Sequence, residues 1–453
     1  MQEMTMRLLV TAALGTAIAA TALWASTPRL QPLPDGIWRT SGYGYVFKLK
    51  GEKLAIFDET GKTCLLNGIL EGAGARDWTG NAAIAADHMH AILHAGISRI
   101  GVSRLMALPQ NCGAKQEDQA PLANFDVLWE TFSEQYAFFR IRNVDWNALR
   151  AEFRPQAAAA RSPEQLFTVL SAMLSRLKDA HVSLTAGENE FKVERSPEQT
   201  APGPDGVAPT RKGMQRALKD YISGSDTPLV KPAQPLGRNR IWFGELKGKI
   251  GYVAIFAMGG FAEDDMAAED HTRSAHAAFQ EFARAFRGMK GVVVDLRYNQ
   301  GGYDTVSLEL TALFAARPGV AFRKRAHGTA EPAYGVPLAP AEPVRLPLPV
   351  AVLISEHTVS AGETAATAFR TLPNATLIGQ STQGALSDVL EKALPNGWRF
   401  TLSNEIFETV DGSVPEGAGI KPNIETRAPA APRTPRERFQ PDIDEAVRAL
   451  ASR

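Results

Sequence analysis

A serine at the start of an expected helix is the first residue in this chain that could do covalent chemistry. Residues 349–354 form a short apolar, β-branched run that is typical of a buried strand, and residues 361–372 have the pattern of a helix. Ser360 would therefore lie at a helix N-terminus, where unpaired N–H groups and the helix dipole favour the oxyanion formed when a serine attacks a carbonyl. Ser360-x-x-Glu363 is equally a capping box, and this stretch alone favours that interpretation.

A serine hydroxyl also needs a base to take its proton, and the positions of the histidines limit the choice. None of the eight histidines follows Ser360, which excludes the Ser-acid-His order of the α/β-hydrolases, and Thr358 replaces the first glycine of their Gly-x-Ser-x-Gly turn. His357 lies in the same turn as Ser360 and would at most orient the loop. His181 is the better candidate, because a helix-to-strand turn at residues 179–183 could direct it into a cleft. On spacing alone, His181 is more typical of a structural histidine.

A glycine pair offers hydrogen-bond donors for an oxyanion. Gly301 and Gly302 follow residues 291–296, an apolar run that is typical of a fully buried strand. Glycines in that place can present backbone N–H groups at close range. Phosphate-binding loops use similar turns, so the pair by itself specifies no chemistry.

The alternation of strand and helix across residues 239–430 predicts an α/β core with a mostly parallel sheet that helices cover. Pro441 is expected to start a short helix in the C-terminal tail, residues 431–453. Within the core, strands are expected at 250–256, 291–296, 349–354, 398–403 and 406–410, and helices across 279–286, 305–315 and 361–372.

A helical subdomain is expected at residues 120–190. Phe125, Leu128, Trp129 and Phe132 recur on one helical stripe. A second helix has Ser162 as its N-cap and Pro163 in its first position. Residues 187–238 are rich in proline, glycine and charge, and they are interpreted as a flexible insertion or lid with a helical piece near residues 214–221.

Residues 35–115 have the composition of a small, separate β-rich domain. Its two cysteines, Cys64 and Cys112, are the only ones in the chain and could form a disulfide in an oxidising compartment; otherwise they are two unpaired small residues. His90 and His94 would share a helix face, as zinc ligands can. No cysteine or second acidic ligand completes a set, so no metal site is expected.

The N-terminal residues 1–34 are interpreted as a targeting segment. Arg7 precedes the uncharged run 8–25, which ends in small residues, as in a secretory signal peptide; the run would also serve as an uncleaved membrane anchor. The body of the protein is therefore expected outside the cytoplasm, periplasmic or secreted. Lys+Arg and Asp+Glu number 49 each, so the formal net charge of zero gives no sign of a nucleic-acid partner.

Four motifs follow one another along the second half of the chain. They are Asp-Leu-Arg-Tyr-Asn-Gln-Gly-Gly at 295–302, Thr-Val-Ser-Ala-Gly-Glu at 358–363, Gly-Gln-Ser-Thr-Gln-Gly at 379–384 and Glu-Gly-Ala-Gly-Ile-Lys-Pro-Asn-Ile at 416–424. In this order they resemble the C-terminal (tail-specific) processing and tricorn-core group of serine peptidases. Residues 177–184 resemble the Asp-x-His segment of that group, and the resemblance extends over roughly residues 120–427. It implies a crotonase/ClpP-like spiral of ββα units behind an N-terminal helical subdomain.

Two departures decide which branch of the group the chain is similar to. In the tail-specific branch a lysine base follows the last glycine of the third motif, and here that position is Ala385. The chain instead looks like the tricorn branch, although the serine that precedes the histidine there is replaced by Ala180. The resemblance then implies Ser360 as nucleophile, His181 as general base, Glu416 as orienting carboxylate, and an oxyanion hole made by Ala361 N–H with Gly301 or Gly302.

The implied reaction is hydrolysis of a peptide bond in a peptide or protein substrate, through an acyl-enzyme on Ser360 and without a metal or organic cofactor. One alternative is a non-catalytic ligand- or peptide-binding protein of the same fold, as in the retinoid-binding relatives of these peptidases. A second is an acyl-CoA enzyme on the related crotonase-like fold, which would need a basic, glycine-rich phosphate site that the sequence lacks. Cleavage specificity and oligomeric state stay open.

Overall fold

The computed structural model describes residues 30–112, 118–193, 210–264, 266–426 and 434–452. Residues 1–29 of the expected targeting segment and residues 194–209 of the expected insertion lie outside them. Within the described ranges, no helix combines the length and the apolar composition needed to cross a membrane.

A seven-stranded sheet forms the centre of the described α/β core. Its strands are β10 (Gln234–Leu236), β11 (Ile241–Leu246), β12 (Ile250–Ile255), β13 (Gly291–Asp295), β16 (Val350–Ile354), β17 (Ala375–Gly379) and β21 (Ile424–Glu425). They lie in the order β10-β11-β12-β13-β16-β17-β21. The pairs from β12 to β21 are parallel and those between β10, β11 and β12 are antiparallel, so the predicted mostly parallel sheet is confirmed.

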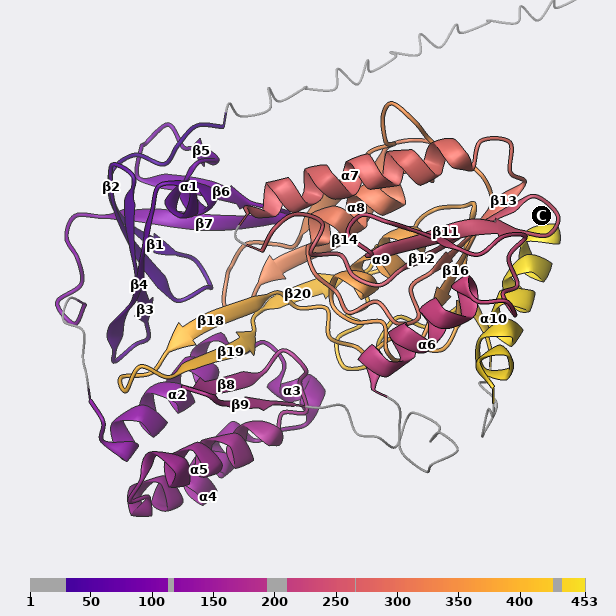
Figure 1. Cartoon of the computed structure of the whole chain (residues 1–453). Coiled ribbons are helices and arrows are strands. Elements are labelled where there is room, and N and C mark those ends of the chain that lie inside the picture. Colours follow the sequence, from indigo (N-terminus) through magenta and orange to yellow (C-terminus); the bar gives the residue numbers. More distant parts are fainter. Residues whose placement is uncertain (1–29, 113–117, 194–209, 265, 427–433, 453) are drawn as a thin grey trace, which may run out of the picture.

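Helices cover both faces of this sheet (Figure 1). Because side chains alternate along a strand, Val292 and Val294 of β13 face one layer and Val293 faces the other. Figure 1 shows α7 on the opposite side of the sheet from α6 and α10. One layer contains α7 (Ala268–Ala285), α8 (Asp304–Ala312) and α9 (Ala361–Phe369), and the other contains α6 (Arg211–Ser223) and α10 (Pro435–Ala451).

The helix predicted near residues 214–221 is α6, but the predicted start of the last helix is wrong. α10 begins at Pro435, and Pro441 lies inside its second turn. The Thr434 Oγ1 atom accepts a hydrogen bond from the N–H of Glu437 at 3.1 Å. A threonine N-cap followed by proline is a strong start signal, and it takes precedence over the proline further along.

The first region of the chain is a second, antiparallel sheet in the order β4-β3-β2-β1-β7-β6-β5. His90 and His94 lie on β6, so the helix considered for them is wrong. Ala91 and Leu93 are buried and alternate with exposed His90 and Ile92, which is the period of a strand. The elements are β1 (Gly36–Thr40), β2 (Tyr45–Lys50), β3 (Lys53–Glu59), β4 (Cys64–Glu71), α1 (Ala73–Thr79), β5 (Ala82–Ile84), β6 (His90–Ala95) and β7 (Ser98–Leu105).

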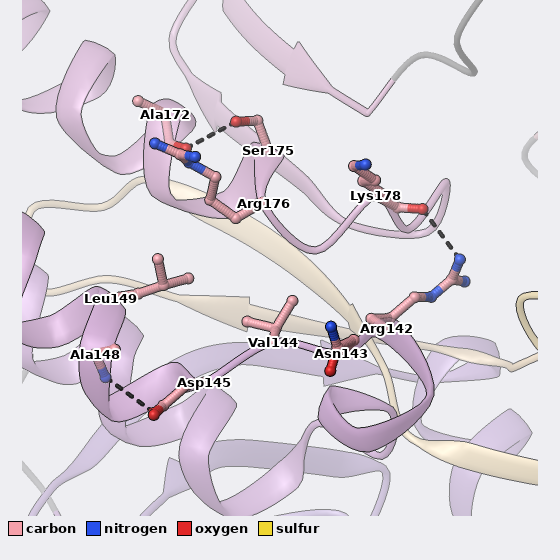
Figure 2. Close-up of a pocket in the computed structure, with 10 residues that line it drawn as sticks. All are labelled: Arg142, Asn143, Val144, Asp145, Ala148, Leu149, Ala172, Ser175, Arg176 and Lys178. Atoms are coloured by element: carbon pink, nitrogen blue, oxygen red, sulfur yellow. Dashed lines mark hydrogen bonds between the residues drawn. The ribbon is translucent and has the colours of Figure 1, made fainter.

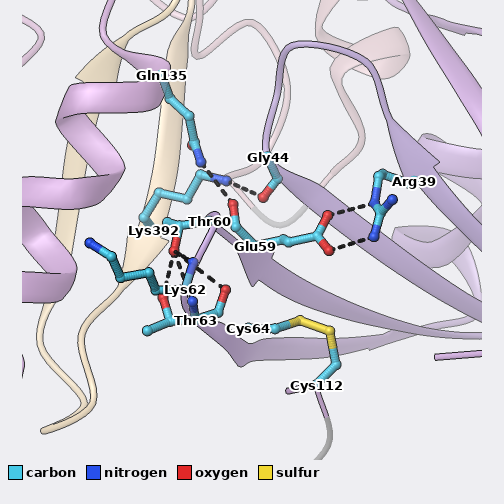
Figure 3. The surroundings of a disulfide bond; sticks show 10 residues. All are labelled: Arg39, Gly44, Glu59, Thr60, Lys62, Thr63, Cys64, Cys112, Gln135 and Lys392. Atoms are coloured by element: carbon cyan, nitrogen blue, oxygen red, sulfur yellow. Dashed lines mark hydrogen bonds and ion pairs between the residues drawn. A yellow bond between two sulfur atoms is a disulfide. The ribbon is translucent and has the colours of Figure 1, made fainter. Parts of the chain in front are cut away.

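Cys64 and Cys112 form a disulfide, as one of the two sequence interpretations required (Figure 3). Cys64 is the first residue of β4, and Cys112 follows β7. The bond therefore fixes the end of this region to its sheet, close to the Thr60–Thr63 turn drawn in Figure 3.

Helices α2 (Pro121–Gln135), α3 (Phe139–Arg142), α4 (Trp146–Ala159) and α5 (Pro163–Ser175) form the helical subdomain. The Oγ atom of Ser162 accepts from the N–H of Gln165 at 3.4 Å, so the predicted cap of α5 is confirmed. The short helix α3 was not predicted.

A small sheet attaches this subdomain to the core. It has the order β18-β19-β8-β9 and contains β8 (Ser183–Ala186), β9 (Asn189–Lys192), β18 (Val389–Ala393) and β19 (Arg399–Ser403). A further sheet, β15-β14-β20, contains β14 (Gly319–Ala326), β15 (Tyr334–Leu338) and β20 (Glu405–Glu408).

The first sheet has a small hydrophobic cluster of its own, which contains Val46, Phe57, Cys64 and Cys112, and it also shares a larger cluster with the rest of the protein. One hydrophobic cluster includes Trp38 of β1, Phe125 of α2, Leu170 of α5 and Phe400 of β19. In addition, the Nζ atom of Lys392 on β18 donates to the carbonyl of Gly44 at 2.9 Å (Figure 3). The first sheet, the helical subdomain and the strands that extend from the core are thus packed together.

Candidate active site

Ser360 lies in a strained turn between β16 and α9. Its φ of 54° and ψ of −127° belong to a region that side-chain-bearing residues rarely adopt. It is the N-cap residue of α9 and is half-buried. In α/β-hydrolases, a strained strand-to-helix turn presents the nucleophilic serine at the top of the sheet.

The Glu363 carboxylate holds the turn in place. Its Oε2 atom accepts from the N–H of Ser360 at 3.2 Å and of Ala385 at 2.8 Å, and its Oε1 atom accepts from the N–H of Gly384 at 2.6 Å and from Thr382 Oγ1 at 2.5 Å. Burial raises the pKa of Glu363, whereas these hydrogen bonds lower it. A fully buried carboxyl group that accepts four hydrogen bonds stabilises the turn, as the capping interpretation expects.

The glycine pair lies directly against Ser360. A Cβ atom on Gly301 would be 2.7 Å from the Cβ atom of Ser360, so no larger residue fits without a shift. The N–H of Gly301 donates to Asn299 Oδ1 at 2.9 Å, and the carbonyl of Gly301 accepts from the N–H of Met258 at 2.7 Å. The N–H groups of Gly302 and Ala361 donate to no group among the described residues.

The backbone of His181 is fixed on both sides. Its N–H donates to Asp179 Oδ1 at 2.9 Å, and its carbonyl accepts from Thr401 Oγ1 of β19 at 2.7 Å. The Nδ1 atom of the imidazole is buried and has no partner in the described part of the chain. Burial lowers the pKa of His181; Asp179 and Asp388 oppose this effect and Arg142 adds to it.

His357, the other histidine near the nucleophile, contributes to the shape of the turn. Its ring packs on Tyr298 with centroids 5.6 Å apart, and its carbonyl accepts from the Nε atom of Arg211 at 2.9 Å. The orienting role of its imidazole stays a prediction.

Glu416 accepts hydrogen bonds from Arg142 and from the loop that follows Gly384. Its Oε1 atom accepts from Arg142 Nη2 at 2.9 Å, and its Oε2 atom accepts from the N–H groups of Leu386 and Ser387 at 2.9 and 3.1 Å. No hydrogen bond joins it to His181 among the described residues. Burial, followed by the charge of Asp179, raises the pKa of Glu416 to about 8, and Arg142 opposes this.

The loop at residues 384–388 connects the surroundings of the serine with those of the histidine. The N–H of Ser360 donates to the carbonyl of Ala385 at 3.0 Å. Three residues later, Asp388 is close enough to His181 for each charge to shift the pKa of the other. Both candidate residues therefore have partners on one short loop.

Asp388, whose side chain is 43% exposed, belongs to a charge cluster with the buried side chains of Lys324 and Glu405 that sequence reasoning missed. Its Oδ2 atom accepts from Lys324 Nζ at 2.6 Å, and Lys324 also lies 2.5 Å from Glu405 Oε2. Against the effect of burial, Lys324 lowers the pKa of Asp388, while burial raises the pKa of Glu405 to about 8 and of Asp304 to about 7. One signal was available: Lys324 stands between Phe322 and Ala326 on the inward face of β14.

A metal centre has no support among the described residues, where no group of three or more histidine, cysteine, aspartate or glutamate side chains is arranged to hold an ion.

Two family models match the chain on either side of the predicted insertion. Residues 249–426 match peptidase family S41, and residues 118–175 match the tricorn protease C1 domain. The first match contains Ser360, both glycines of the pair and Glu416. The second ends before His181.

The comparisons with individual proteins agree with these matches. The carboxy-terminal processing protease CtpA of Bacillus subtilis strain 168 is 28% identical over 151 residues, which are 33% of this chain and 31% of CtpA. The match thus spans less than a third of the length of CtpA.

Two solved structures share the fold at low identity. A putative peptidase from Parabacteroides merdae ATCC 43184 has a TM-score of 0.58 at 22% identity, covering 74% of this chain and 97% of that one. Mature CPAF has a TM-score of 0.51 at 12% identity, covering 73% and 96%. Residues 249–426, which carry most of the α/β core, thus belong to peptidase family S41, and the helical subdomain contains the segment that matches the tricorn protease C1 domain.

Proposed function

We propose that this protein is a serine endopeptidase that hydrolyses peptide bonds through an acyl-enzyme on Ser360. The observation that carries the proposal is the strained, half-buried position of Ser360 at a helix N-terminus, against a glycine turn, together with two nearby N–H groups, of Gly302 and Ala361, that have no partner in the described ranges. Free donors at such a place are what a developing oxyanion requires.

His181 is the proposed general base. Since its Nδ1 atom is buried, the Nε2 atom is the nitrogen that would receive the Ser360 proton. A lowered pKa keeps the imidazole neutral near pH 7, as a base must be. The Asp388 carboxylate would then stabilise the imidazolium that forms after proton transfer.

The proposed reaction proceeds in two stages. Ser360 Oγ attacks the peptide carbonyl carbon while His181 takes its proton, and the N–H groups of Gly302 and Ala361 bind the oxyanion. We assign Gly302 rather than Gly301 as donor, because the N–H of Gly301 is already bonded to Asn299. The imidazolium then protonates the leaving amine, and water hydrolyses the ester by the same route in reverse.

The remaining details of the proposal concern architecture and location. We propose that the core is a crotonase/ClpP-like spiral of ββα units, of which β11-β12-α7 is one. A peptide or protein is the proposed substrate, by similarity to a carboxy-terminal processing protease. The disulfide and the leader-like residues 1–34 support an extracytoplasmic location, periplasmic or secreted.

A fluorophosphonate probe tests the proposal, since it forms a covalent bond with an activated serine. Labelling of the wild type is expected, with loss in Ser360→Ala and in His181→Ala, together with cleavage of peptides from a mixed library by the wild type alone. A folded wild type that neither reacts nor cleaves any peptide would instead be a binding protein of the same fold.

A further inference from the structure

Arg142 reaches both sides of the proposed catalytic pair. It is the last residue of α3, which ends where Asn143 adopts a left-handed conformation with φ of 55°. Its Nη1 atom donates to the carbonyl of Lys178 at 3.1 Å, a contact that Figure 2 shows. Its Nη2 atom donates to Glu416 Oε1 at 2.9 Å and to the carbonyl of Gly384 at 3.3 Å.

These contacts belong to two different parts of the protein. Lys178 is three residues before His181, in the turn that ends the helical subdomain. Gly384 immediately precedes Ala385, whose carbonyl accepts the N–H of Ser360. One planar guanidinium therefore binds the histidine turn with one nitrogen and the serine loop with another.

The buried carboxyl oxygens around Arg142 explain why an arginine is needed. The side chains of Asp179 and Glu416 are 0% and 2% exposed, and Arg142 Nη2 lies 3.8 Å from Asp179 Oδ2 and 2.9 Å from Glu416 Oε1. Asp179 in turn accepts the N–H of His181. A guanidinium can satisfy several acceptors in fixed directions, whereas a lysine ammonium on a flexible stem cannot hold the same geometry.

We propose that Arg142 is a positioning residue of the reaction, which holds the His181 turn against the Ser360 loop and through which Glu416 acts on the histidine. This inference depends on the proposed peptidase function. In this proposal the Glu416 carboxylate acts on the His181 imidazole indirectly. The path leads from Glu416 through Arg142 and Asp179 to the backbone N–H of His181.

The kinetic test of the proposal compares Arg142→Met and Arg142→Lys with the control Arg154→Met. Arg154 lies in the same subdomain and forms a two-bond pair with Asp126 at 2.8 Å for each bond, remote from the serine loop in its contacts. For Arg142→Met we expect kcat on a cleaved peptide and the rate of fluorophosphonate labelling to fall about 100-fold, because a small displacement of the base has a large effect on rate. In Arg142→Lys the same two rates should fall roughly tenfold for the same reason. In Arg154→Met both rates should equal those of the wild type.

The split between kinetic constants and the pH profile separate positioning from other roles. A positioning residue changes kcat with little change in KM; a rise in KM at constant kcat would mean that Arg142 binds substrate, and would overturn the proposal. His181 is faced by Arg142, Asp179 and Asp388, so loss of the one positive charge should move the acid limb of kcat/KM to higher pH. If the substitution only reduced the fraction of folded protein, the pH at which kcat/KM falls on the acid side would not change.

Chemical rescue gives a second measurement on a weakened variant. The Arg142 side chain borders a cavity of about 780 Å³ together with Asn143 and Lys178, so a small cation can reach its place (Figure 2). Millimolar guanidinium should restore part of the activity of Arg142→Ala and none in Ser360→Ala.

The outcomes distinguish this inference from the proposed function. If the wild type neither labels nor cleaves, the peptidase function fails. Arg142→Lys keeps a positive charge beside Asp179 and Glu416, so this variant is expected to fold. If the wild type is active and Arg142→Lys has the same kcat and pH profile as the wild type, the positioning role of Arg142 is overturned. The Lys variant answers this even where the Met variant does not fold.

Discussion

Gly301 and Ser360 lie so close together that a Cβ atom on the glycine would be 2.7 Å from the Cβ atom of the serine. The contact joins the turn after β13 to the start of α9, two segments far apart in the sequence. It holds the candidate nucleophile against the glycine turn whose next residue is Gly302.

A substitution at Gly301 should therefore abolish activity. Gly301→Ala places a methyl group against Ser360, and we expect fluorophosphonate labelling to become undetectable. Gly412→Ala is the matched control, because Gly412 has φ of 85° against 84° for Gly301 but has nothing within 4 Å of the added atom. Both variants carry the left-handed backbone strain of roughly 1–2 kcal/mol. Equal labelling in the two would show that the close contact has no consequence.

The pH dependence of cleavage should report His181. Burial lowers its pKa below the usual 6.5, and the neutral imidazole acts as base, so kcat/KM should stay high down to a pH below that value and fall as the ring is protonated. Steady-state kinetics on one peptide from pH 4 to pH 9 would measure this. If kcat/KM instead fell already at a pH well above neutral on the acid side, the general base would be a group other than His181.

Asp388 should shift that limb. Its carboxylate raises the pKa of His181, so Asp388→Asn is expected to move the acid limb to lower pH and to reduce kcat by roughly tenfold, equivalent to about 1.4 kcal/mol. Glu391→Gln on the same segment removes an exposed charge that pairs with Arg399, and it should leave both quantities unchanged. If the acid limb of kcat/KM moved to higher pH in Asp388→Asn, the proposed role of Asp388 beside His181 would be contradicted.

The buried lysine should matter for stability. Lys324→Met leaves Glu405 and Asp388 without their cation, and we expect the free energy of unfolding to fall by about 3–5 kcal/mol at pH 9, where Glu405 is ionised. The pKa of Glu405 is raised to about 8 and that of Asp304 to about 7, so these carboxyl groups are protonated at pH 5 and the loss should be smaller there. Urea unfolding at both pH values tests the sign. Lys53→Met, which removes an exposed pair with Glu71, should change the free energy by less than about 1 kcal/mol.

The disulfide should stabilise the first sheet region. The bonded cysteines are 48 residues apart, and closing a loop of that size is worth about 4 kcal/mol in the chain-entropy account. Cys64→Ser with Cys112→Ser should lower the unfolding free energy by that order, and the native protein should show no free thiol by mass spectrometry after alkylation. Two alkylated thiols in unreduced protein would refute the bond.

Local sequence patterns predicted the elements well wherever neighbours along the chain decide the structure. Ser162 and Pro163 marked the start of α5, and the apolar runs marked β13 and β16. Pro441 misled because a stronger start signal preceded it at Thr434.

The groups that sequence reasoning missed are fixed by distant partners. Arg142 has no motif of its own, and its role appears only when Lys178, Gly384 and Glu416 converge on it. Lys324 and Asp388 meet through the packing of β14 against the loop after the third motif. Spacing along the chain contains no information on such contacts.

The pairing of β8 with β19 has a practical consequence. If residues 249–426 were produced alone, β19 would lose its neighbour and become an unprotected edge with open backbone donors and acceptors. Edges of this kind recruit strands from other molecules. The peptidase segment is thus expected to aggregate without the helical part that precedes it, although a family model matches it as a unit.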